Sequence, residues 1–313
     1  MARVLVTGAT GFVGGAVLAA LRRAGHAPVA AIRRAGAPAD AECRPVGEIG
    51  PDTDWRAALA GIDAVIHLAA RVHLMRDHAA DPDAAFRRVN TEGTRRLAEE
   101  AAAVGVGRLV FLSSVKAAAE GSARPLSERD PPAPRDAYGR SKLAAEAALS
   151  GVAAAGRLDV VTLRPPLVYG PGAQGNFRAL VGLCRRGVPL PLGAVDNRRS
   201  LVALGNLADA AVCAATAPPA GPGHRLYYVR DGEDLSTAEL VRRLRRALGR
   251  PPRLLAAPPG LLRGLARLAG RGAAADRLLG SLQVDDTAFR RDFGWTPPLT
   301  VDAALAEVAE DGR

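Results

Sequence analysis

Two residues four positions apart, Tyr138 and Lys142, carry side chains that together can transfer a proton. The chain has four tyrosines, and only two of its 42 basic side chains are lysines. A pair at this spacing is therefore expected by chance about 0.03 times. On a helix the two side chains share one face, and a nearby ammonium group lowers the phenol pKa from its usual value of about 10. The pair predicts a general acid/base, with Tyr138 carrying the proton.

A glycine-rich turn near the N-terminus predicts a cofactor for this pair. The stretch "TGATGFVGGAV" places Gly8, Gly11 and Gly14 after a strand-like run and at the start of a helix-like run. Glycines there allow a tight turn and let backbone amides approach a pyrophosphate at the positive end of the helix. The spacing alone is weak evidence, but its context favours a dinucleotide site. Lys142 would then reach the nicotinamide ribose, and the positive nicotinamide would also lower the pKa of Tyr138.

The end of the second strand-like run indicates which dinucleotide is preferred. Many NAD-binding folds place an acidic residue there, against the ribose 2′-hydroxyl. This chain has Arg33 and Arg34 instead, and a guanidinium would attract a 2′-phosphate. We therefore expect NAD(P) as the cofactor, with NADP(H) preferred over NAD(H). The alternative is that both arginines are ordinary surface residues of an arginine-rich chain.

These residues must be positioned by strands and helices that alternate along the chain. Short apolar runs at 3–8, 28–34, 64–70, 108–114 and 159–165 are separated by alanine-rich stretches typical of helices. Such alternation predicts an α/β fold with a Rossmann-type doubly wound parallel sheet. The alternation weakens after residue 170. We expect a dinucleotide-binding Rossmann domain over 1–170 and a smaller C-terminal substrate lobe over 171–313, with some of its segments returning to the sheet.

The net charge of +10 raises the question of a nucleic-acid partner. The most basic stretch, 240–253, has apolar residues at helical spacing and would leave its arginines on the opposite, solvated face: Leu240, Val241, Leu244 and Leu248. No aromatic residues are interleaved for base stacking. A polyanion site there is the alternative reading, but we expect no nucleic-acid partner.

The cysteines and the N-terminus indicate the compartment. Cys43, Cys184 and Cys213 are far apart and form no C-x-x-C pair, so neither a disulfide framework nor a metal site is expected. The chain enters its first strand-like run directly, and no uncharged stretch of about 18 residues is present to span a membrane. We therefore expect a cytoplasmic protein.

Taken together, the motifs resemble those of the extended short-chain dehydrogenase/reductase family, the NAD-dependent epimerases and dehydratases of nucleotide sugars. The resemblance extends over nearly the whole chain and rests on "TGATGFVG", "HLAA" at 67–70, "VNTEGT" at 89–94, "LSS" at 112–114, "YGRSK" at 138–142, "LRPPLVYGPG" at 163–172 and "RRSLVALGNLADA" at 198–210. It implies that Tyr138 is the general acid/base, that Lys142 holds the ribose and tunes Tyr138, that Ser114 binds the reacting oxygen, and that Asn90 assists them.

The resemblance also implies the binding residues. The expected cofactor-binding residues are Gly8, Gly11, Phe12, Val13, Gly14, Arg33, Arg34, Glu48, Ile49, Leu68, Ala69, Ala70, Tyr138, Lys142 and Pro165. Of these, Glu48 and Ile49 of "VGEI" would contact adenine, and Ala69 would lie beside the phosphates. The expected substrate-binding residues are Ser114, Lys116, Asn176 and Arg199. The expected partners are a nucleotide-sugar substrate and, at most, a second copy of the chain in a homodimer.

The residues that follow Ser114 narrow the reaction. In family dehydratases an Asp-Glu pair stands there, because elimination of water needs its own acid and base. Here Val115 and Lys116 occupy those positions, which leaves hydride transfer at the sugar C4. The resemblance implies either a reductase of a UDP-4-keto-6-deoxy-N-acetylhexosamine or a UDP-hexose 4-epimerase, both serving surface-polysaccharide synthesis, and Arg33 favours the reductase. The alternatives are a UDP-hexose 4-epimerase, acting on UDP-glucose or UDP-N-acetylglucosamine with retained NAD, and a non-catalytic dinucleotide-binding regulator.

Overall fold

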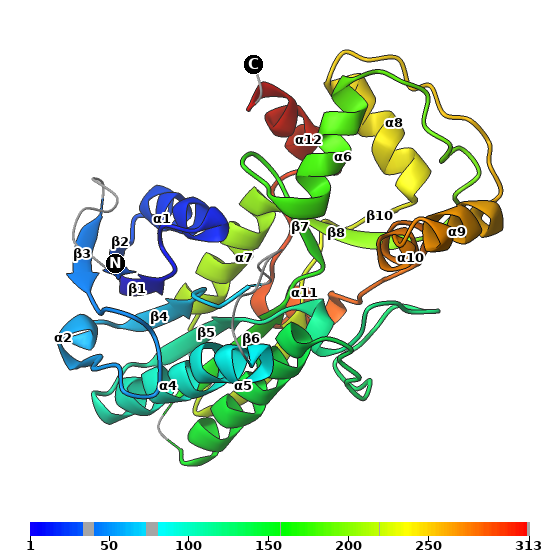
Figure 1. The fold of residues 1–313 in the computed structure, drawn as a ribbon. Coiled ribbons are helices and arrows are strands. Elements are labelled where there is room, and N and C mark those ends of the chain that lie inside the picture. Colours follow the sequence, from blue (N-terminus) through cyan, green and yellow to red (C-terminus); the bar gives the residue numbers. More distant parts are fainter. Residues whose placement is uncertain (34–40, 73–80, 157, 219, 312–313) are drawn as a thin grey trace.

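A parallel sheet of seven strands forms the centre of the computed structural model, which describes residues 1–33, 41–72, 81–156, 158–218 and 220–311 (Figure 1). Its strand order is β3-β2-β1-β4-β5-β6-β9. The strands are β1 (Arg3–Thr7), β2 (Ala27–Ile32), β3 (Glu42–Pro45), β4 (Ala64–His67), β5 (Arg108–Leu112), β6 (Asp159–Arg164) and β9 (Gly223–Tyr228). This order confirms the predicted Rossmann-type doubly wound fold.

Helices cover both faces of this sheet because its strands are buried on both sides. In β1, Val4 and Val6 point to one face and Leu5 to the other. The first face is covered by α1 (Phe12–Arg23), α7 (Leu204–Thr216) and α11 (Thr287–Phe293). The second face belongs to the core that contains α2 (Arg56–Leu59), α4 (Gly93–Ala103) and α5 (Ala137–Ala154). Two short helices precede α4: α3 (Pro82–Phe86) and the π-helix η1 (Arg87–Glu92).

A second, smaller sheet lies on the C-terminal side of the chain, in the order β10-β8-β7. Its strands are β7 (Leu167–Tyr169), β8 (Arg199–Ala203) and β10 (Asp234–Leu235), and the helices of this region are α6 (Gly175–Arg185), α8 (Thr237–Ala247), α9 (Pro259–Leu268), α10 (Gly272–Leu279) and α12 (Val301–Glu310). These elements share a hydrophobic core of their own. Strand β9 comes from beyond residue 170 and pairs with β6 in the large sheet. The domain boundary at residue 170 stays a prediction.

The five apolar runs that predicted strands all form strands, and each strand ends one to three residues before the run does. The remaining described residues of these runs lie in the loops at the carboxyl edge of the sheet. Among the described residues, no helix is both long enough and apolar enough to cross a bilayer.

The basic helix α8 differs from its prediction in one residue. Leu240, Val241 and Leu244 are buried as expected, but Arg245 is also completely buried. Its guanidinium donates to the carbonyl oxygens of Arg253, at 2.6 Å, and of Val188. These hydrogen bonds to loop carbonyls compensate for the burial of the guanidinium. The solvated face of this helix is therefore narrower than the sequence pattern indicates.

The segment 281–285 joins the two parts of the molecule. It lies between the loop 122–126, which comes after β5 in the chain, and strand β8 of the small sheet. The backbone N–H groups of Ser122, Leu126 and Ser200 each donate to its carbonyl oxygens at 2.9 Å. The segment is thus bound on both sides, as a strand is within a sheet.

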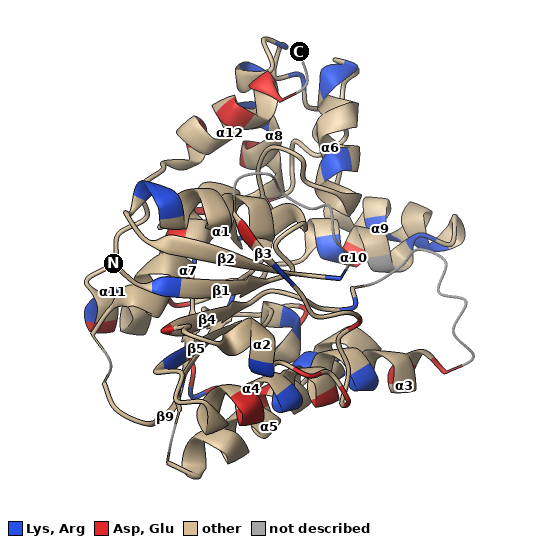
Figure 2. Ribbon diagram, turned by 90° about the vertical axis from the view of Figure 1, so that its left-hand side faces the viewer, with Lys and Arg blue, Asp and Glu red and all other residues tan. Residues whose placement is uncertain are grey.

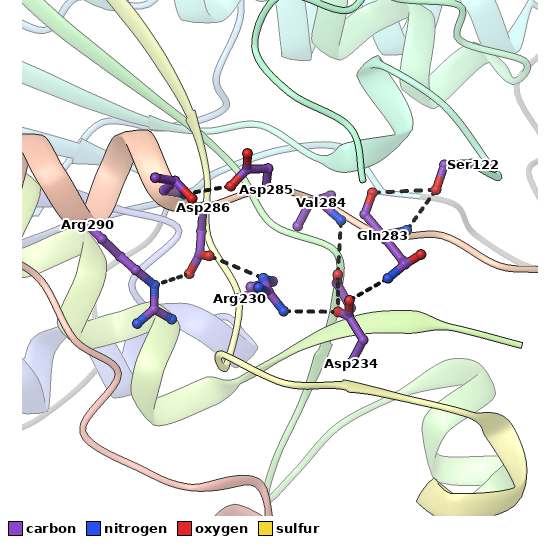
Figure 3. A network of polar contacts seen from close by, with 10 residues as sticks. Ser122, Arg230, Asp234, Gln283, Val284, Asp285, Asp286 and Arg290 are labelled. Atoms are coloured by element: carbon purple, nitrogen blue, oxygen red, sulfur yellow. Dashed lines mark hydrogen bonds and ion pairs between the residues drawn. The ribbon is translucent and has the colours of Figure 1, made fainter. Parts of the chain in front are cut away.

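Side chains reinforce this junction (Figure 3). Asp234 accepts hydrogen bonds from Gln283, at 2.6 Å, and from Arg230, at 3.2 Å. Arg230 also donates to Asp286 at 3.2 Å, and Arg290 donates to the other oxygen of Asp286 at 2.6 Å. The network links β10 of the small sheet to Arg230, which follows β9 of the large sheet, and to α11.

Candidate active site

The predicted site residues gather at the carboxyl edge of the large sheet. The glycine turn follows β1, Ala69 follows β4, Ser114 follows β5 and Pro165 follows β6. Because these strands are parallel neighbours in the order β1-β4-β5-β6, their carboxyl ends meet at one edge, where ligands bind in open α/β sheets. The carbonyl of Pro165 accepts the N–H of Val115 at 2.9 Å, which ties the loops after β5 and β6 together.

The glycine turn has a geometry that only glycine satisfies. Gly8 has φ +68°, and a Cβ there would lie 2.8 Å from the backbone nitrogen of Ala69. A Cβ at Gly14 would lie 2.2 Å from the carbonyl oxygen of Gly8. Helix α1 begins at Phe12, and its N-cap, Gly11, makes no side-chain cap hydrogen bond. The helix start therefore presents backbone N–H groups to an anion, which fits the pyrophosphate of a dinucleotide.

A buried histidine positions the loop that faces this turn. The N–H groups of Leu68 and Ala69 donate to Thr7 Oγ1 at 3.2 and 3.1 Å. Thr7 Oγ1 also lies 2.7 Å from His67 Nδ1, and His67 Nε2 lies 2.9 Å from Thr94 Oγ1. Burial lowers the pKa of His67 to about 3, so the imidazole is neutral. Thr7 and His67 stand within motifs quoted from the sequence, but their role in fixing the cofactor loop was not predicted.

The residues predicted to bind the adenosine half of the cofactor follow strands β2 and β3. Arg33 is exposed directly after β2, and Arg34 lies outside the described residues. Glu48 is exposed, whereas Ile49 is half-buried against the start of α4, where a Cβ on Gly93 would come within 2.7 Å of its Cγ2. Their contacts with a dinucleotide stay predictions.

Tyr138 lies in the first turn of α5, which is capped by Asp136. The carboxylate of Asp136 accepts the N–H of Gly139 at 2.7 Å, and the Tyr138 ring packs edge-on to Phe86 with 6.2 Å between ring centroids. Burial and the charge of Asp136 raise the pKa of Tyr138 to about 12, against the opposing effect of a hydrogen bond with Ser114. At neutral pH the phenol is therefore protonated and can donate to an oxygen beside Ser114.

The pKa of Tyr138 is thus raised by its protein surroundings, whereas the sequence predicted that Lys142 and a nicotinamide together would lower it. The reason is that burial dominates and that the ammonium of Lys142 lies over the ring of Phe111, 4.2 Å from its centroid. Burial also lowers the pKa of Lys142 to about 7, and the charge of Glu146 acts in the opposite direction. Burial thus disfavours the charged form of Lys142, and Glu146 favours it.

A buried ionic network supports Lys142 from the next turn of α5. Glu146 accepts hydrogen bonds from Ser113 Oγ at 2.5 Å and from Arg164 at 2.9 and 2.5 Å. Arg164 also donates to the hydroxyl of Tyr228 at 3.2 Å. The side chains of Glu146 and Arg164 are each 4% exposed. Glu146 follows Lys142 by four residues, so the sequence indicated that the two side chains are neighbours on the helix. The role of Glu146 in this network was not predicted.

Asn90 connects the π-helix η1 to the first turn of α5. Its Oδ1 accepts the N–H of Arg71 at 2.7 Å, and its Nδ2 donates to Ser141 Oγ at 2.9 Å. Ser141 in turn donates to the carbonyl oxygen of Tyr138 at 2.8 Å. Short π-helices are frequent at functional sites. The geometry suits Asn90 to position Tyr138, although its predicted role in catalysis stays a prediction.

The second lysine of the chain is held within the protein. Lys116 Nζ donates to Asp136 at 2.5 Å and lies 3.6 Å from Glu120. The backbone N–H of Lys116 also donates to Ser114 Oγ at 3.2 Å. The turn η2 (Val115–Ala117) is thereby fixed against the start of α5. A contact between Lys116 and substrate stays a prediction.

The two predicted diphosphate contacts lie on different elements of the smaller lobe. Asn176 is exposed in the first turn of α6. Arg199, in β8, donates from Nη1 to the carbonyl oxygens of Arg277 and Gly280 at 2.6 and 2.9 Å, and burial lowers its pKa. Over the described ranges, no hydrogen bond joins Asn176 to Arg199. Their joint role in substrate binding stays a prediction.

The doubly wound sheet, the glycine turn and the Ser114–Tyr138–Lys142 arrangement define an enzyme of the extended short-chain dehydrogenase/reductase class. Residues 4–229 match the model of the NAD dependent epimerase/dehydratase family. The chain belongs to this family.

Comparisons with individual proteins agree with this assignment. The chain is 39% identical to a UDP-glucose 4-epimerase of Vibrio cholerae, over 98% of this chain and 94% of that protein. Among solved structures, MoeE5 in complex with UDP-glucuronic acid and NAD is 28% identical, with a TM-score of 0.75 and 99% of both chains covered. The UDP-N-acetylglucosamine 4-epimerase from Bacillus cereus shares the fold, with a TM-score of 0.80, 21% identity and 99% of both chains covered.

Proposed function

We propose that this enzyme is a UDP-hexose 4-epimerase that retains NAD through its catalytic cycle. The observation that carries the proposal is the 39% identity to the Vibrio cholerae UDP-glucose 4-epimerase over nearly the full length of both chains. The sequence alone favoured a reductase because of Arg33. The similarity to this relative favours the epimerase over the reductase. The non-catalytic regulator is set aside because Ser114, Tyr138 and Lys142 are all present.

The bound nicotinamide supplies a hydride acceptor and donor for the sugar C4. The chain's own residues hold and move the proton of the C4 hydroxyl. Tyr138, fixed by the cap of α5, exchanges this proton, and Ser114 binds the same oxygen from the end of β5. Lys142 holds the ribose. Its ammonium form, which the charge of Glu146 favours, stabilises the phenolate when Tyr138 gives up its proton.

The residues after Ser114 argue against dehydration as the reaction. Val115 is 4% exposed, and Lys116 is paired with Asp136. Neither provides the free carboxyl groups with which family dehydratases eliminate water. We therefore confine the proposal to hydride transfer.

The proposal predicts turnover without added cofactor. Protein purified without dinucleotide should release NAD on denaturation, and the native enzyme should interconvert UDP-glucose with UDP-galactose or UDP-N-acetylglucosamine with UDP-N-acetylgalactosamine. The measurement is chromatography of the sugar nucleotides after incubation, with Tyr138→Phe as the blank. Oxidation of NADPH by a UDP-4-keto-6-deoxy-N-acetylhexosamine, with no epimer formed from either pair, would reject the epimerase.

The second candidate is a reductase of such a 4-keto sugar that uses NADPH, and Arg33 is the observation that favours it. Arg33 is exposed at the end of β2, where a carboxylate would contact the 2′-hydroxyl of NAD. A guanidinium there suits a 2′-phosphate instead.

Under this second candidate, NADPH should bind more tightly than NADH by about 1.5 to 3 kcal/mol, the usual worth of a charge-assisted hydrogen bond. Arg33→Asp should reverse the preference, because the carboxylate repels the phosphate and accepts from the free 2′-hydroxyl. The measurement is a titration of cofactor-free protein with both dinucleotides. Arg23→Asp is the control, since Arg23 is exposed at the far end of α1. Equal affinities in the unmodified protein, or equal effects of both variants, would remove Arg33 from the cofactor site.

The compartment, the assembly and the substrate contacts of the protein are also proposals. We place it in the cytoplasm, which is supported by three free cysteines. A homodimer is the proposed assembly, and the diphosphate of the substrate is the proposed partner of Asn176 and Arg199.

A further inference from the structure

Helix α9 exposes an unbroken row of leucines. None of its residues is buried, and the side chains of Leu261, Leu265 and Leu268 are 56%, 56% and 88% exposed. Their spacing of four and three residues places them on one face of the helix. Single exposed leucines are ordinary, but a row of this kind is a surface suited to binding.

The same region is strongly basic. Residues 251–280 contain five arginines and one acidic residue, Asp276. Arg263 and Arg267 both lie within ion-pair distance of Asp276, at 3.7 and 4.0 Å, so this one carboxylate cannot neutralise the segment. The segment therefore carries a net charge of about +4, and Arg263 and Arg267 lie on α9 itself.

The row lies on a projecting part of the molecule. Helix α9 packs against α10, and in Figure 1 the two form a pair at the right-hand edge, away from α1 and α4. Figure 2 shows basic residues on both helices. The end of α10 is anchored by Asn197, which donates to the carbonyl oxygen of Gly280 at 2.8 Å, and by Arg199. The pair is thus attached to the lobe through α10 and through Leu262 of α9, while Leu261, Leu265 and Leu268 stay exposed.

We propose that the α9–α10 pair docks this enzyme on an anionic lipid surface. The leucine row would enter the boundary between headgroups and acyl chains, and the surrounding arginines would contact lipid phosphates. A helix with an exposed apolar face and flanking arginines is the arrangement that binds in the plane of a membrane interface. A second copy of the chain would cover leucines equally well, but it would bring the same positive charge against itself. The inference is independent of which sugar reaction the enzyme performs.

The test is sedimentation of the full-length enzyme with vesicles. We expect binding to vesicles of phosphatidylglycerol and phosphatidylcholine, weak binding to phosphatidylcholine alone, and weaker binding at high salt. The double variant Leu265→Gln/Leu268→Gln should lower the partition coefficient about tenfold or more. Leu183→Gln, at a leucine of α6 that is 41% exposed, is the matched control and should bind as the unmodified protein does.

A second pair of variants tests the charges separately. Arg267→Gln/Arg271→Gln should weaken binding to the anionic vesicles about tenfold or more, whereas Arg22→Gln/Arg23→Gln on α1 should not. Circular dichroism confirms that each variant is folded. The proposal fails if the unmodified protein stays in the supernatant, or if the α9 variants bind like their controls. It also fails if the leucine variants change the mass in analytical ultracentrifugation and leave vesicle binding unchanged, because the row would then be a self-association surface.

Discussion

Replacing Tyr138 with phenylalanine should lower turnover by about 10²-fold or more and leave dinucleotide binding nearly unchanged. The variant loses only the hydroxyl, which is the group that exchanges the proton and bonds to Ser114. The ring and its edge-on packing against Phe86 are retained, so the site should keep its shape. The measurements are the turnover number for the UDP-hexose pair and a titration with NADH.

A matched tyrosine elsewhere in the fold controls for this change. Tyr227 is 4% exposed, and its hydroxyl donates to Asp292 at 2.9 Å. Tyr227→Phe therefore also removes one hydrogen bond, but on the side of the sheet covered by α11. Its turnover should stay within about twofold, since a single hydrogen bond contributes about 1 kcal/mol to stability. Similar losses in both variants would mean that Tyr138 acts only through stability.

Glu146→Gln should destabilise the fold by about 3 to 5 kcal/mol, the usual cost of removing one partner of a buried ion pair. The amide keeps the shape of the carboxylate but leaves the guanidinium of Arg164 without a compensating charge. It also removes the attraction that keeps Lys142 protonated, so the pKa of Lys142 should fall further below about 7. The measurement is the free energy of unfolding from urea denaturation.

Asp83 provides the matched control for Glu146. It pairs with Arg140 of the same helix α5 at 2.9 Å, but the two side chains are 58% and 52% exposed. Asp83→Asn should cost no more than about 1 kcal/mol, because surface ion pairs contribute little. If Glu146→Gln lowered the free energy of unfolding by no more than Asp83→Asn does, the buried network would contribute no more to stability than a surface ion pair.

The central sheet was predictable because its buried strands read as short apolar runs between helical stretches. Strand β3 was not predicted, and β9 was expected only as an unlocated segment that returns to the sheet. The sequence of β3 is "ECRP" and that of β9 is "GHRLYY", and both lie at the edges of the sheet, where partial exposure admits polar residues. Only tertiary pairing with β2 and β6 makes them strands. The π-helix before α4 also has no signal in composition or periodicity.

The candidate site was predictable where its residues are close in sequence and not where the fold brings them together. Tyr138 and Lys142 share one helix turn, so their proximity follows from spacing alone. Lys116 and Asp136 are twenty positions apart, and their ion pair depends on the loop that returns to α5. Burial decides the pKa values of His67 and Tyr138, and a sequence does not show how deeply a titratable group is buried.

The junction at residues 281–285 bears on how members of such a family acquire new substrates. This segment is hydrogen-bonded on both sides, and strand β9, from beyond residue 170, completes the large sheet. The part of the chain beyond residue 170 is therefore not a separate unit that can be exchanged for that of a relative, because a cut near residue 170 would separate β9 from its partner β6. Recombination of halves would yield chimeras with unpaired strand edges. New substrate specificity must then arise by substitutions and loop insertions around a fixed framework.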